Sequence, residues 1–366
     1  MKIALAHDHL NQLGGAEKVL FAFHEVYPRA PIYTLIHDSR SARGVFDKLN
    51  IKTSFLQKMP GGLRHMRWYL SWMPAAFESL DLTGYDVVLS DASAFAKGAI
   101  VSSGSLHICY CHTPTRYLWS DTHQYVKELK QGWLIKKILP LVLNKLRAWD
   151  YQAAQRVDNF IANSCNVQKR IKKYYRRESD VIYPPVEVEH FKIADELGKY
   201  YLIGGRLVSY KRFDLAIKAF NKLGIPLKIF GTGPEEEKLR KMAKNNIEFL
   251  GQVSDNKKAE LYSRALGFIH PHEEDFGITA VESMAAGRPV IAYKKGGALE
   301  TVIDGETGVF FEEQEWEALA DAVIRFEPSN FDPVKIREHA LGFGKDRFKR
   351  EMVEFVEKKW KEFQAG

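Results

Sequence analysis

The sequence predicts an α/β protein of two domains, each built on a mostly parallel sheet. Short apolar segments alternate with segments of helical length along the 366 residues, and this alternation is typical of parallel sheets covered by helices. A chain of this length, 45% hydrophobic, exceeds the usual size of one hydrophobic core. The pair Pro184–Pro185 interrupts the pattern halfway along the chain and favours an extended path, so we place the domain boundary there.

The first half contains five predicted strands, and polar or glycine residues follow several of them. The strands are KIALAH (2–7), PIYTLIH (31–37), YDVVLSD (85–91), LHICYCH (106–112) and VDNFIANS (157–164). Gly14 and Gly15 lie between the first strand and a run of apolar residues at helical spacing. A glycine pair allows a phosphate to approach a helix start, although a tight turn alone also uses two glycines. Neither G-x-G-x-x-G nor G-x-x-x-x-G-K is present.

His112 stands at the carboxyl end of the strand 106–112. Parallel α/β sheets bind ligands at the carboxyl ends of their strands, so this histidine is placed to face a ligand. A histidine without any chemical role in the following loop is the simpler interpretation of that residue taken alone.

The second half repeats the alternation and places two cations after its first strand. Predicted strands occupy 199–205, 227–231, 247–251 and 266–271, and predicted helices occupy 213–223, 234–245 and 255–265. Arg206 and Lys211 follow the strand 199–205 directly. A diphosphate suits such a pair, because opposite unit charges about 4 Å apart attract by about 4 kcal/mol at an effective dielectric of 20. Both residues can equally be ordinary surface charges.

The segment 270–291, HPHEEDFGITAVESMAAGRPVI, carries the most specific pattern of the chain. Glu274 and Glu282 are separated by seven residues, and a helix is predicted to begin near Gly277. The N–H groups of Phe276, Gly277 and Ile278 would then point at a bound ligand, and such a helix start attracts phosphate. Alone, the two glutamates are equally explained as acids that answer the helix dipole.

The positive charge of the protein lies in its first half. Residues 1–198 hold 26 Lys and Arg against 19 Asp and Glu, whereas residues 199–366 hold 27 against 27. This imbalance indicates an acidic partner surface: nucleic acid, anionic lipid or a phosphate-rich substrate. Motifs that read bases are missing, so no nucleic acid partner is expected.

Two segments, 61–77 and 127–150, combine Trp, Leu and Ile with Lys and Arg. They predict peripheral contact with an anionic membrane, for which the candidates in the first segment are Arg64, Arg67, Trp68 and Trp72. The second segment is open to another interpretation, in which a core helix exposes lysines at 136, 137 and 145 and buries an apolar stripe. That stripe comprises Ile135, Ile138, Leu139 and Val142.

Several classes of protein are disfavoured by composition. No apolar run reaches the about 18 residues that a membrane-spanning helix needs, and the start MKIALAHDHL does not read as a signal peptide, so a cytoplasmic location is expected. The three cysteines fit neither a disulfide framework nor a zinc site.

Taken together, these features resemble the retaining GT-B glycosyltransferases of family four, also called group 1. That family includes bacterial mannosyltransferases, glycogen synthases and sucrose synthases. The resemblance extends over nearly the whole chain and is most specific between 270 and 309. It is carried by GGAEKVL, CHTPTRYLW, VDNFIANS, VIYPPVEVEHF, GGRLVSYKR, IFGTGP, FLGQVSDNKKAELY, HPHEEDFGITAVESMAAGRPVIA and GGALETVIDGETGVFF, and by the closing helix.

The resemblance implies a GT-B fold, with two Rossmann-like domains whose parallel sheets face each other across a cleft. Residues 1–186 would form the acceptor-binding domain and residues 187–349 the nucleotide-sugar-binding domain, with a C-terminal helix at 350–363 packing back on the first. It also implies sugar transfer with retention and without metal or cofactor, the leaving phosphate helping to take the acceptor proton. No D-x-D occurs, so the metal clamp of the second main glycosyltransferase fold has no candidate.

Ten residues receive roles from the resemblance. Arg206 and Lys211 would neutralise the donor diphosphate, Glu274 would hold the hydroxyls of the donor sugar, and Glu282 would bond the ribose. The N–H groups of Phe276, Gly277 and Ile278 would meet donor oxygens, Gly14 and Gly15 would approach the diphosphate, and His112 would lie beside the transferred sugar.

The segment CHTPTRYLW (111–119) is similar to a branch of lipopolysaccharide and exopolysaccharide mannosyltransferases that use GDP-mannose. We therefore expect mannose to pass from GDP-mannose to a glycan or a lipid-linked saccharide at the inner face of the membrane. The spacing of the motif residues does not distinguish a GDP-mannose donor from UDP-glucose or UDP-N-acetylglucosamine. The same motifs are compatible with a GT-B epimerase and with a non-catalytic nucleotide-sugar-binding component of an assembly complex.

Overall fold

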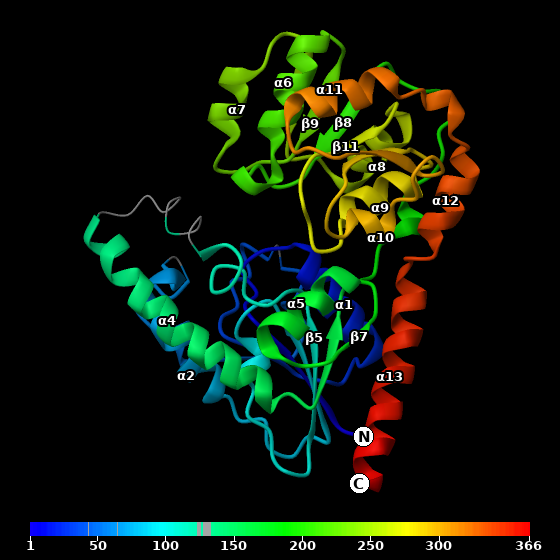
Figure 1. Cartoon of the computed structure of the whole chain (residues 1–366). Coiled ribbons are helices and arrows are strands. Elements are labelled where there is room, and N and C mark those ends of the chain that lie inside the picture. The colour runs from blue at the N-terminus through cyan, green and yellow to red at the C-terminus, as the bar shows by residue number, and fades with distance from the viewer. Residues whose placement is uncertain (43, 64, 123–125, 127–132) are drawn as a thin grey trace. The chain divides into compact units, whose positions relative to one another are not determined.

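The computed structural model describes the chain except for residues 43, 64, 123–125 and 127–132 (Figure 1). The chain divides into two compact units: unit 1 comprises Met1–Tyr183 with Lys349–Gly366, and unit 2 comprises Pro184–Phe348. The limits predicted from the sequence are 186 and 350. Among the described residues, no helix has both the length and the apolar character needed to cross a bilayer.

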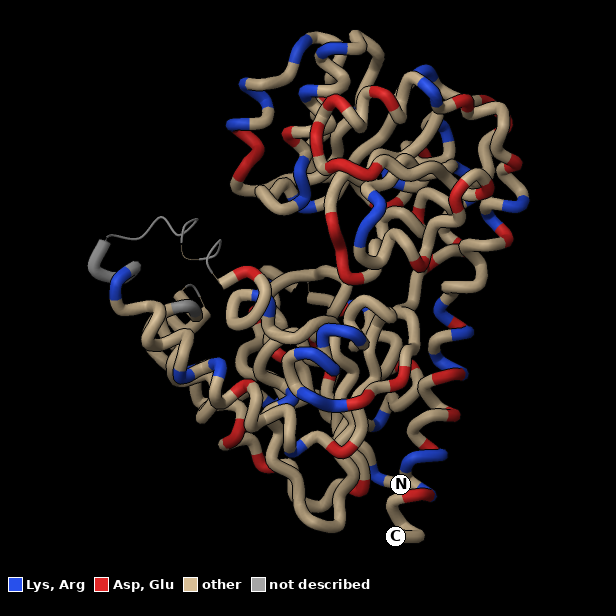
Figure 2. Tube along the Cα trace, in the orientation of Figure 1, with Lys and Arg blue, Asp and Glu red and all other residues tan. Residues whose placement is uncertain are grey.

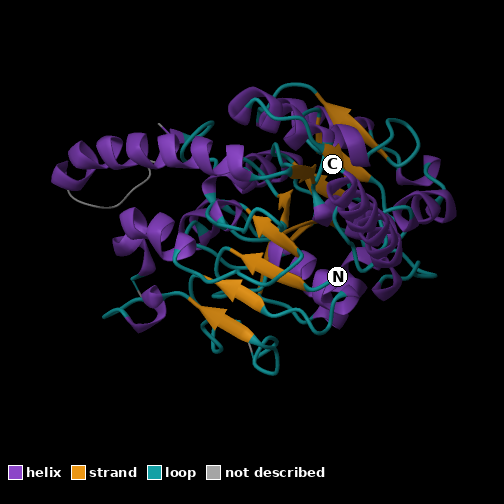
Figure 3. Cartoon of the chain, turned by 90° about the horizontal axis from the view of Figure 1, so that it is seen from below, coloured by secondary structure: helices purple, strands orange, loops and turns teal. Residues whose placement is uncertain are grey.

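Unit 1 contains a seven-stranded sheet in the order β3-β2-β1-β4-β5-β6-β7, and every neighbouring pair is parallel. Figure 3 shows several parallel strands side by side. The strands are β1 Ile3–His7, β2 Ile32–Thr34, β3 Ile51–Thr53, β4 Val87–Ala92, β5 Leu106–Cys111, β6 Asn159–Ala162 and β7 Asp180–Val181. Residues of β1, β4 and β5 are buried throughout, as expected for strands covered on both faces. The strands β3 and β7, of three and two residues, were not predicted from the sequence.

Helices cover the sheet of unit 1 and join its strands. They are α1 Gly15–Val26, α2 Met73–Glu78, α4 Trp133–Arg156 and α5 Cys165–Tyr175, with short 3-10 helices η1 Phe55–Lys58, η2 Met66–Trp72 and η3 Ala96–Gly98. The start of α5 follows from its sequence, because the Ser164 side chain accepts the N–H of Val167 as an N-cap. The apolar face of α1 packs inward through Val19, Leu20 and Phe23.

The C-terminal helix α13, Lys345–Ala365, begins in unit 2 and belongs to unit 1 from Lys349 onward. Lys349 forms an ion pair with Glu25 of α1. Met352 and Val356 are fully buried, while Val353, Phe355 and Trp360 are half-buried. The C-terminal helix therefore contributes buried side chains to the core of unit 1.

Unit 2 contains a six-stranded sheet in the order β10-β9-β8-β11-β12-β13, again with parallel pairs. The strands are β8 Tyr201–Gly204, β9 Leu227–Phe230, β10 Ile247–Gly251, β11 Phe268–His270, β12 Val290–Tyr293 and β13 Gly308–Phe311. Its core includes Ile203, Ile229, Ile269 and Ile291 from four of these strands. The first four strands in chain order were predicted from the sequence, whereas β12 and β13 were not.

Four helices of unit 2 were predicted from the sequence, whereas the last three before the C-terminal helix were not. The helices are α6 Phe213–Leu223, α7 Glu236–Met242, α8 Asp255–Arg264, α9 Ile278–Ala285, α10 Ala298–Thr301, α11 Trp316–Arg325 and α12 Pro333–Leu341, with 3-10 helices η4 Val188–His190, η5 Ser209–Lys211 and η6 Pro328–Asn330. The predicted helix 213–223 has the bounds of α6, whereas α7 is shorter at both ends than the predicted 234–245. Before α9, Gly277 has a φ of 93°, a conformation that favours glycine.

Candidate active site

The candidate site of unit 2 lies where β8 and β11 end. These strands are neighbours in a parallel sheet, so the residues that follow them emerge at the same edge. Arg206 and Lys211 follow β8, and Glu274 follows β11. Strand order thus explains why residues far apart in the sequence are brought together.

Lys211 and Glu274 form an ion pair in which the ammonium nitrogen lies 2.7 Å from Oε1 of the carboxylate. The two side chains are only 11% and 18% exposed. Burial by itself would raise the pKa of Glu274, but Lys211 and His272 outweigh it and hold that pKa well below its usual value. Burial would lower the pKa of Lys211, and the Glu274 carboxylate outweighs it in the same way, so this pKa is raised. Both groups are therefore charged at neutral pH.

The loop that carries Glu274 is held by a second loop with two glycines. The N–H of Gly297 donates to the backbone oxygen of Glu274 at 2.8 Å. A Cβ on Gly296 would lie 2.4 Å from that same oxygen, and a Cβ on Gly297 would lie 2.4 Å from Cα of Phe276. Only glycine permits such close approach of two backbones, so these residues help to set the position of Glu274.

Glu282 occupies a different position, on the buried side of α9. It is 5% exposed, and its carboxylate accepts from the Lys258 ammonium at 2.9 Å and from the Tyr262 hydroxyl at 3.4 Å. Burial, reinforced by the Glu282 charge, raises the pKa of Tyr262 well above its usual value, so this hydroxyl stays a donor. Lys258 and Tyr262 were not predicted from the sequence. The sequence offered one indication of them: they are four residues apart in the predicted helix 255–265, so their side chains share one helix face.

The remaining predicted residues of unit 2 surround the start of α9. Arg206 is solvent-exposed, in contrast to the paired Lys211. The Phe276 side chain is 3% exposed, and its ring lies edge-on to Phe343 with centroids 5.6 Å apart. Gly277 is the N-cap of α9 and Ile278 its first residue, so the N–H groups at this point belong to a helix start.

His270, His272 and Glu274 alternate along the end of β11, and their ligand atoms lie within 4.8 Å of one another. In the described part of the chain, neither ring nitrogen of the buried His270 has a hydrogen-bond partner. Burial lowers the pKa of His270 to about 3, so its ring is neutral. These donor atoms suit a transition metal, but the Lys211 ammonium already neutralises Glu274, and a cation added about 4 Å from it would be repelled by about 4 kcal/mol per unit charge.

In unit 1, polar side chains gather at the carboxyl ends of β1, β4 and β5, which are adjacent in the sheet. Asp91 is fully buried and accepts from Nδ1 of His7 at 2.8 Å and from Nε2 of His112 at 2.5 Å. The His112 side chain is 13% exposed, so it is the member of this group closest to solvent. His112 was predicted from the sequence, whereas His7 and Asp91 were missed, because their only signal was a polar residue at the end of a buried strand.

Glu17 connects this group to the glycine turn. One carboxylate oxygen of Glu17 lies 3.8 Å from Nε2 of His7, and the second oxygen accepts the N–H of Gly14 at 2.7 Å. Gly14 is the N-cap of α1 and Gly15 its first residue. The resemblance places Gly14 near a diphosphate, and in this structure its N–H already has a protein acceptor, the Glu17 carboxylate.

The charges of this group support one another. Burial would lower the pKa of His7, but hydrogen bonds to Asp91 and Glu17 outweigh it and raise that pKa to about 10. Burial would raise the pKa of Asp91 and of Glu17, and their histidine partners outweigh it, so both are lowered. At neutral pH, a buried His7 cation thus lies between two carboxylates.

The loop that follows His112 is anchored by another buried carboxylate, that of Asp150 on α4. Asp150 lies 2.6 Å from the Lys97 ammonium, and both side chains are 1% exposed. The Asp150 carboxylate also accepts three further side-chain hydrogen bonds, each of 2.8 Å. The donors are the hydroxyls of Thr115 and Tyr175 and the indole N–H of Trp119.

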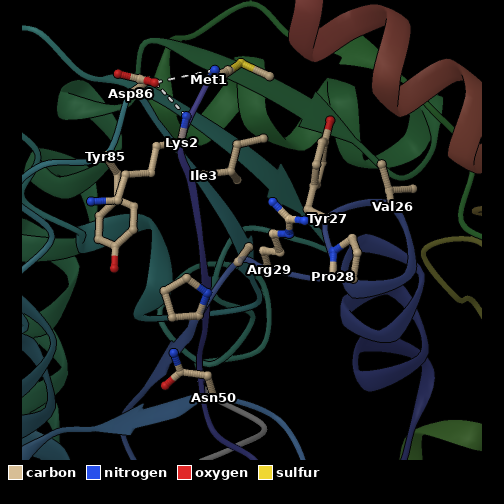
Figure 4. Close-up of a pocket in the computed structure, with 12 residues that line it drawn as sticks. Met1, Lys2, Ile3, Val26, Tyr27, Pro28, Arg29, Asn50, Tyr85 and Asp86 are labelled. Carbon is tan, nitrogen blue, oxygen red and sulfur yellow. Dashed lines mark hydrogen bonds and ion pairs between the residues drawn. The ribbon is translucent and has the colours of Figure 1, made fainter.

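A surface hollow of unit 1 lies away from these residues (Figure 4). It is lined by Lys2, Ile3, Arg29, Tyr85 and Asp86 among others, at the amino ends of the strands. His7, Asp91 and His112 stand at the carboxyl ends of the same sheet. The hollow is therefore separate from the candidate site.

The two segments predicted to contact a membrane differ in how far the structure describes them. In η2, Trp68 and Trp72 are 76% and 58% exposed. Arg64 lies outside the described residues, as does the Arg67 side chain. Figure 2 shows Lys and Arg gathered along α5 of the same unit.

Residues 127–132 also lie outside the described part of the chain, and so does the side chain of Ile135. In α4, Ile138 and Leu141 are 51% and 68% exposed, so Ile138 does not belong to a buried stripe. Leu143 and Leu146 form the buried face instead, with Leu139 and Val142 half-buried beside them. The helix combines a core face with an exposed apolar face.

Comparison with known families decides the identity of the chain. Residues 13–190 match the profile "Glycosyltransferase Family 4", and residues 185–341 match "Glycosyl transferases group 1". The chain is a group 1 glycosyltransferase of family four. The matches adjoin near the Pro184–Pro185 pair and together include both units.

Among curated relatives of this glycosyltransferase is an "Alpha-1,3/1,6-mannosyltransferase ALG2" of Dictyostelium discoideum. It is 26% identical over 278 residues, which are 61% of this chain and 63% of that protein. A "Phosphatidyl-myo-inositol mannosyltransferase" of Mycobacterium leprae is 33% identical over 165 residues, 40% of this chain and 44% of the relative. The matched regions thus span less than two thirds of either relative.

Solved structures show the fold over the full length. The Anabaena protein Alr3699/HepE in complex with UDP-glucose matches with a TM-score of 0.72 and 18% sequence identity, covering 98% of this chain and 100% of that one. Together with the two parallel sheets, this match confirms the GT-B fold predicted from the sequence.

Proposed function

We propose that this glycosyltransferase transfers mannose from GDP-mannose to a glycan or lipid-linked saccharide, with retention and without a metal or cofactor. The observation that carries the proposal is the Lys211–Glu274 ion pair at the strand ends of unit 2. Both side chains are mostly buried, but each keeps some exposure to solvent, so a ligand can reach them. Two relatives named as mannosyltransferases support the choice of sugar.

In this proposal, the donor exchanges partners with the existing ion pair. A diphosphate attracts Lys211 and the exposed Arg206, and the Glu274 carboxylate then accepts hydrogen bonds from sugar hydroxyls. Glu282 can bond a ribose hydroxyl while it keeps Lys258, because a carboxylate offers about four acceptor sites. The donor contacts of Gly14, Gly15, His112, Phe276, Gly277 and Ile278 stay predictions.

The chemistry follows from this arrangement. Charge accumulates on the diphosphate as the glycosidic bond breaks, and fixed cations favour that charged state over the ground state. Removing one such electrostatic donor in an enzyme commonly reduces turnover by about 10²-fold to 10³-fold. In this proposal, Lys211 and Arg206 take the place of the metal ion that other glycosyltransferases bind to the diphosphate.

A donor panel tests the proposal. The purified protein is incubated with GDP-mannose, UDP-glucose and UDP-N-acetylglucosamine, and slow donor hydrolysis and nucleotide binding are measured. Faster hydrolysis of GDP-mannose and tighter binding of GDP than of UDP are expected. The reverse preference would favour the second candidate, a UDP-sugar-dependent transferase, which the UDP-glucose complex of the Anabaena structure makes the natural competitor.

Metal independence has its own test. Dialysis against EDTA is expected to leave the rate of sugar transfer unchanged within about twofold, because in this proposal Lys211 and Arg206 supply the positive charge that the diphosphate needs. A loss that added Mg²⁺ or Mn²⁺ restores would contradict this part of the proposal.

A further inference from the structure

The chain of contacts from Gly14 through Glu17, His7 and Asp91 to His112 does more than fill the interior of unit 1. Strands β1 and β4, the segment after β5 and helix α1 contribute to it, and His112 has the most exposed side chain of the group. Buried polar groups of this kind are kept where they fix one arrangement of donors and acceptors. The arrangement can be read from the atoms involved.

Asp91 determines which nitrogen atoms carry protons. An ionised carboxylate can only accept hydrogen bonds, so both histidine nitrogens that face it must be donors. These atoms are Nδ1 of His7 at 2.8 Å and Nε2 of His112 at 2.5 Å. In a neutral imidazole, one nitrogen donates and its counterpart accepts, so a neutral His112 has its lone pair on Nδ1.

The two histidines keep Asp91 in this role. Asp91 is fully buried, and a buried carboxylate without a cationic partner would take up a proton. Its two histidine partners, His112 first and then the His7 cation, prevent this and keep the pKa of Asp91 lowered. A carboxylate oxygen of Glu17 lies 3.8 Å from the second nitrogen of His7. The Tyr110 ring of β5, edge-on at 5.4 Å between centroids, packs against His112, which follows that strand.

We propose that Asp91 is a positioning residue that holds His112 in the tautomer protonated at Nε2, which leaves Nδ1 as the acceptor atom toward the sugar that the family resemblance already places beside His112. The second half of this inference rests on the proposed function. The first half concerns the protein alone and can be tested without any substrate.

The tautomer is measured by NMR on protein labelled with ¹⁵N-histidine, and a His112 that keeps protons on both ring nitrogens would contradict the assigned tautomer. His112 signals are assigned by their loss in His112→Gln. A protonated Nε2 and an unprotonated Nδ1 are expected in the wild-type protein. A His112 protonated at Nδ1 alone would overturn the inference.

Asp91→Asn extends this test. An asparagine has one acceptor end and one donor end, so it cannot accept from both histidines. At least one of His7 and His112 must therefore change its protonation pattern, and unchanged ring signals of both would contradict a role for Asp91. Asp86→Asn is the matched control, because it makes the same substitution at a carboxylate that is 45% exposed, just before β4, and should leave these signals as they are.

A double-mutant cycle tests the functional half. His112→Gln and Asp91→Asn are each expected to reduce turnover by about tenfold to a hundredfold, which corresponds to about 1.4–2.7 kcal/mol of lost transition-state stabilisation. The double variant should be no slower than His112→Gln within about twofold, because Asp91 acts through His112. Losses that multiply would overturn the positioning role. If His112→Gln keeps full turnover, the proposed contact between His112 and the sugar is wrong. The tautomer of His112 is tested separately by NMR and does not depend on this result.

Discussion

At the scale of single residues, Glu274 and Lys211 form the pair on which most of the proposed chemistry depends. Each is nearly enclosed, and each is the main reason that its partner stays charged. Removing one partner leaves an uncompensated charge, so variants at this pair affect both stability and turnover. The two effects can be separated by measuring them in parallel.

Glu274→Gln and Lys211→Met are predicted to reduce turnover by about 10²-fold or more, because each removes an interaction with developing charge or with the sugar. Lys211→Met should also weaken GDP binding, whereas Glu274→Gln should change it less. Steady-state kinetics and calorimetry measure the two quantities. Glu273→Gln, in the same loop and paired with the exposed Lys295 at 3.2 Å, is the control and should stay near wild-type turnover.

His7 makes the stability of unit 1 depend on pH. Its pKa is raised from 6.5 to about 10, so its contribution is fully present below about pH 6.5 and is lost as the pH rises through about 10. The free energy of unfolding should therefore fall between pH 7 and pH 10, by about 1.4 kcal/mol for each unit of pKa shift at most. Urea unfolding followed by tryptophan fluorescence reports mainly on unit 1, which contains all tryptophans but Trp316.

The control for this experiment is Glu17→Gln, which removes one of the two carboxylates that raise the pKa of His7. Its unfolding free energy should fall at lower pH than that of the wild-type protein. A stability that is constant from pH 7 to pH 10 in the wild-type protein would contradict the assignment of a buried His7 cation.

At the scale of elements, two buried aspartates hold the segments around the candidate site of unit 1. Asp8, next to the end of β1, accepts the N–H groups of residues 93–96, which follow β4, at 2.7 to 2.8 Å. Asp150 on α4 binds the segment after β5 through Thr115 and Trp119. The segments after β4 and β5 are thus fixed by carboxylates from different elements.

Asp150→Asn is predicted to lower the free energy of unfolding by about 3 kcal/mol, because it leaves the Lys97 ammonium buried without a counter-charge. The measurement is the urea midpoint from tryptophan fluorescence. Asp121→Asn is the matched control: Asp121 pairs with Arg116 at 3.2 Å but is 39% exposed, so its loss should cost less than about 1 kcal/mol. Equal effects of the two substitutions would argue against a structural role of the buried pair.

At the scale of the whole molecule, the exposed tryptophans of unit 1 predict where the protein meets a membrane. Trp68 and Trp72 are the exposed aromatic residues of η2, and the same unit carries the excess of positive charge. Indole rings favour the interface of a bilayer, and basic residues favour anionic lipid.

Sedimentation with liposomes tests the contact. Binding should increase with the fraction of anionic lipid, decrease with added salt, and fall several-fold in Trp68→Ser with Trp72→Ser. Ile324→Ser, at a residue of unit 2 that is 65% exposed, is the matched control and should bind as the wild-type protein does. Binding that is indifferent to lipid charge and salt would reject the membrane interface.

The sequence by itself determined the fold class, the family and the position of the main motif. Strands such as 2–7 and 106–112 are short apolar runs, and their alternation with helical segments is a local property that can be read without coordinates. The segment 270–291 is also local, because a strand end, an acidic loop and a helix start follow one another directly. Short strands such as β7 were missed for the same reason, since two residues carry no pattern.

Only the tertiary structure decided which charged groups meet. His7 and Asp91 are 84 residues apart, and they contact because β1 and β4 are neighbours in the sheet. Lys211 and Glu274 pair because β8 and β11 are neighbours in the second sheet, with no strand between them. A sequence shows that each of these residues ends a strand, but strand order fixes the partner, and the partner in turn fixes the charge and the proton position of each group.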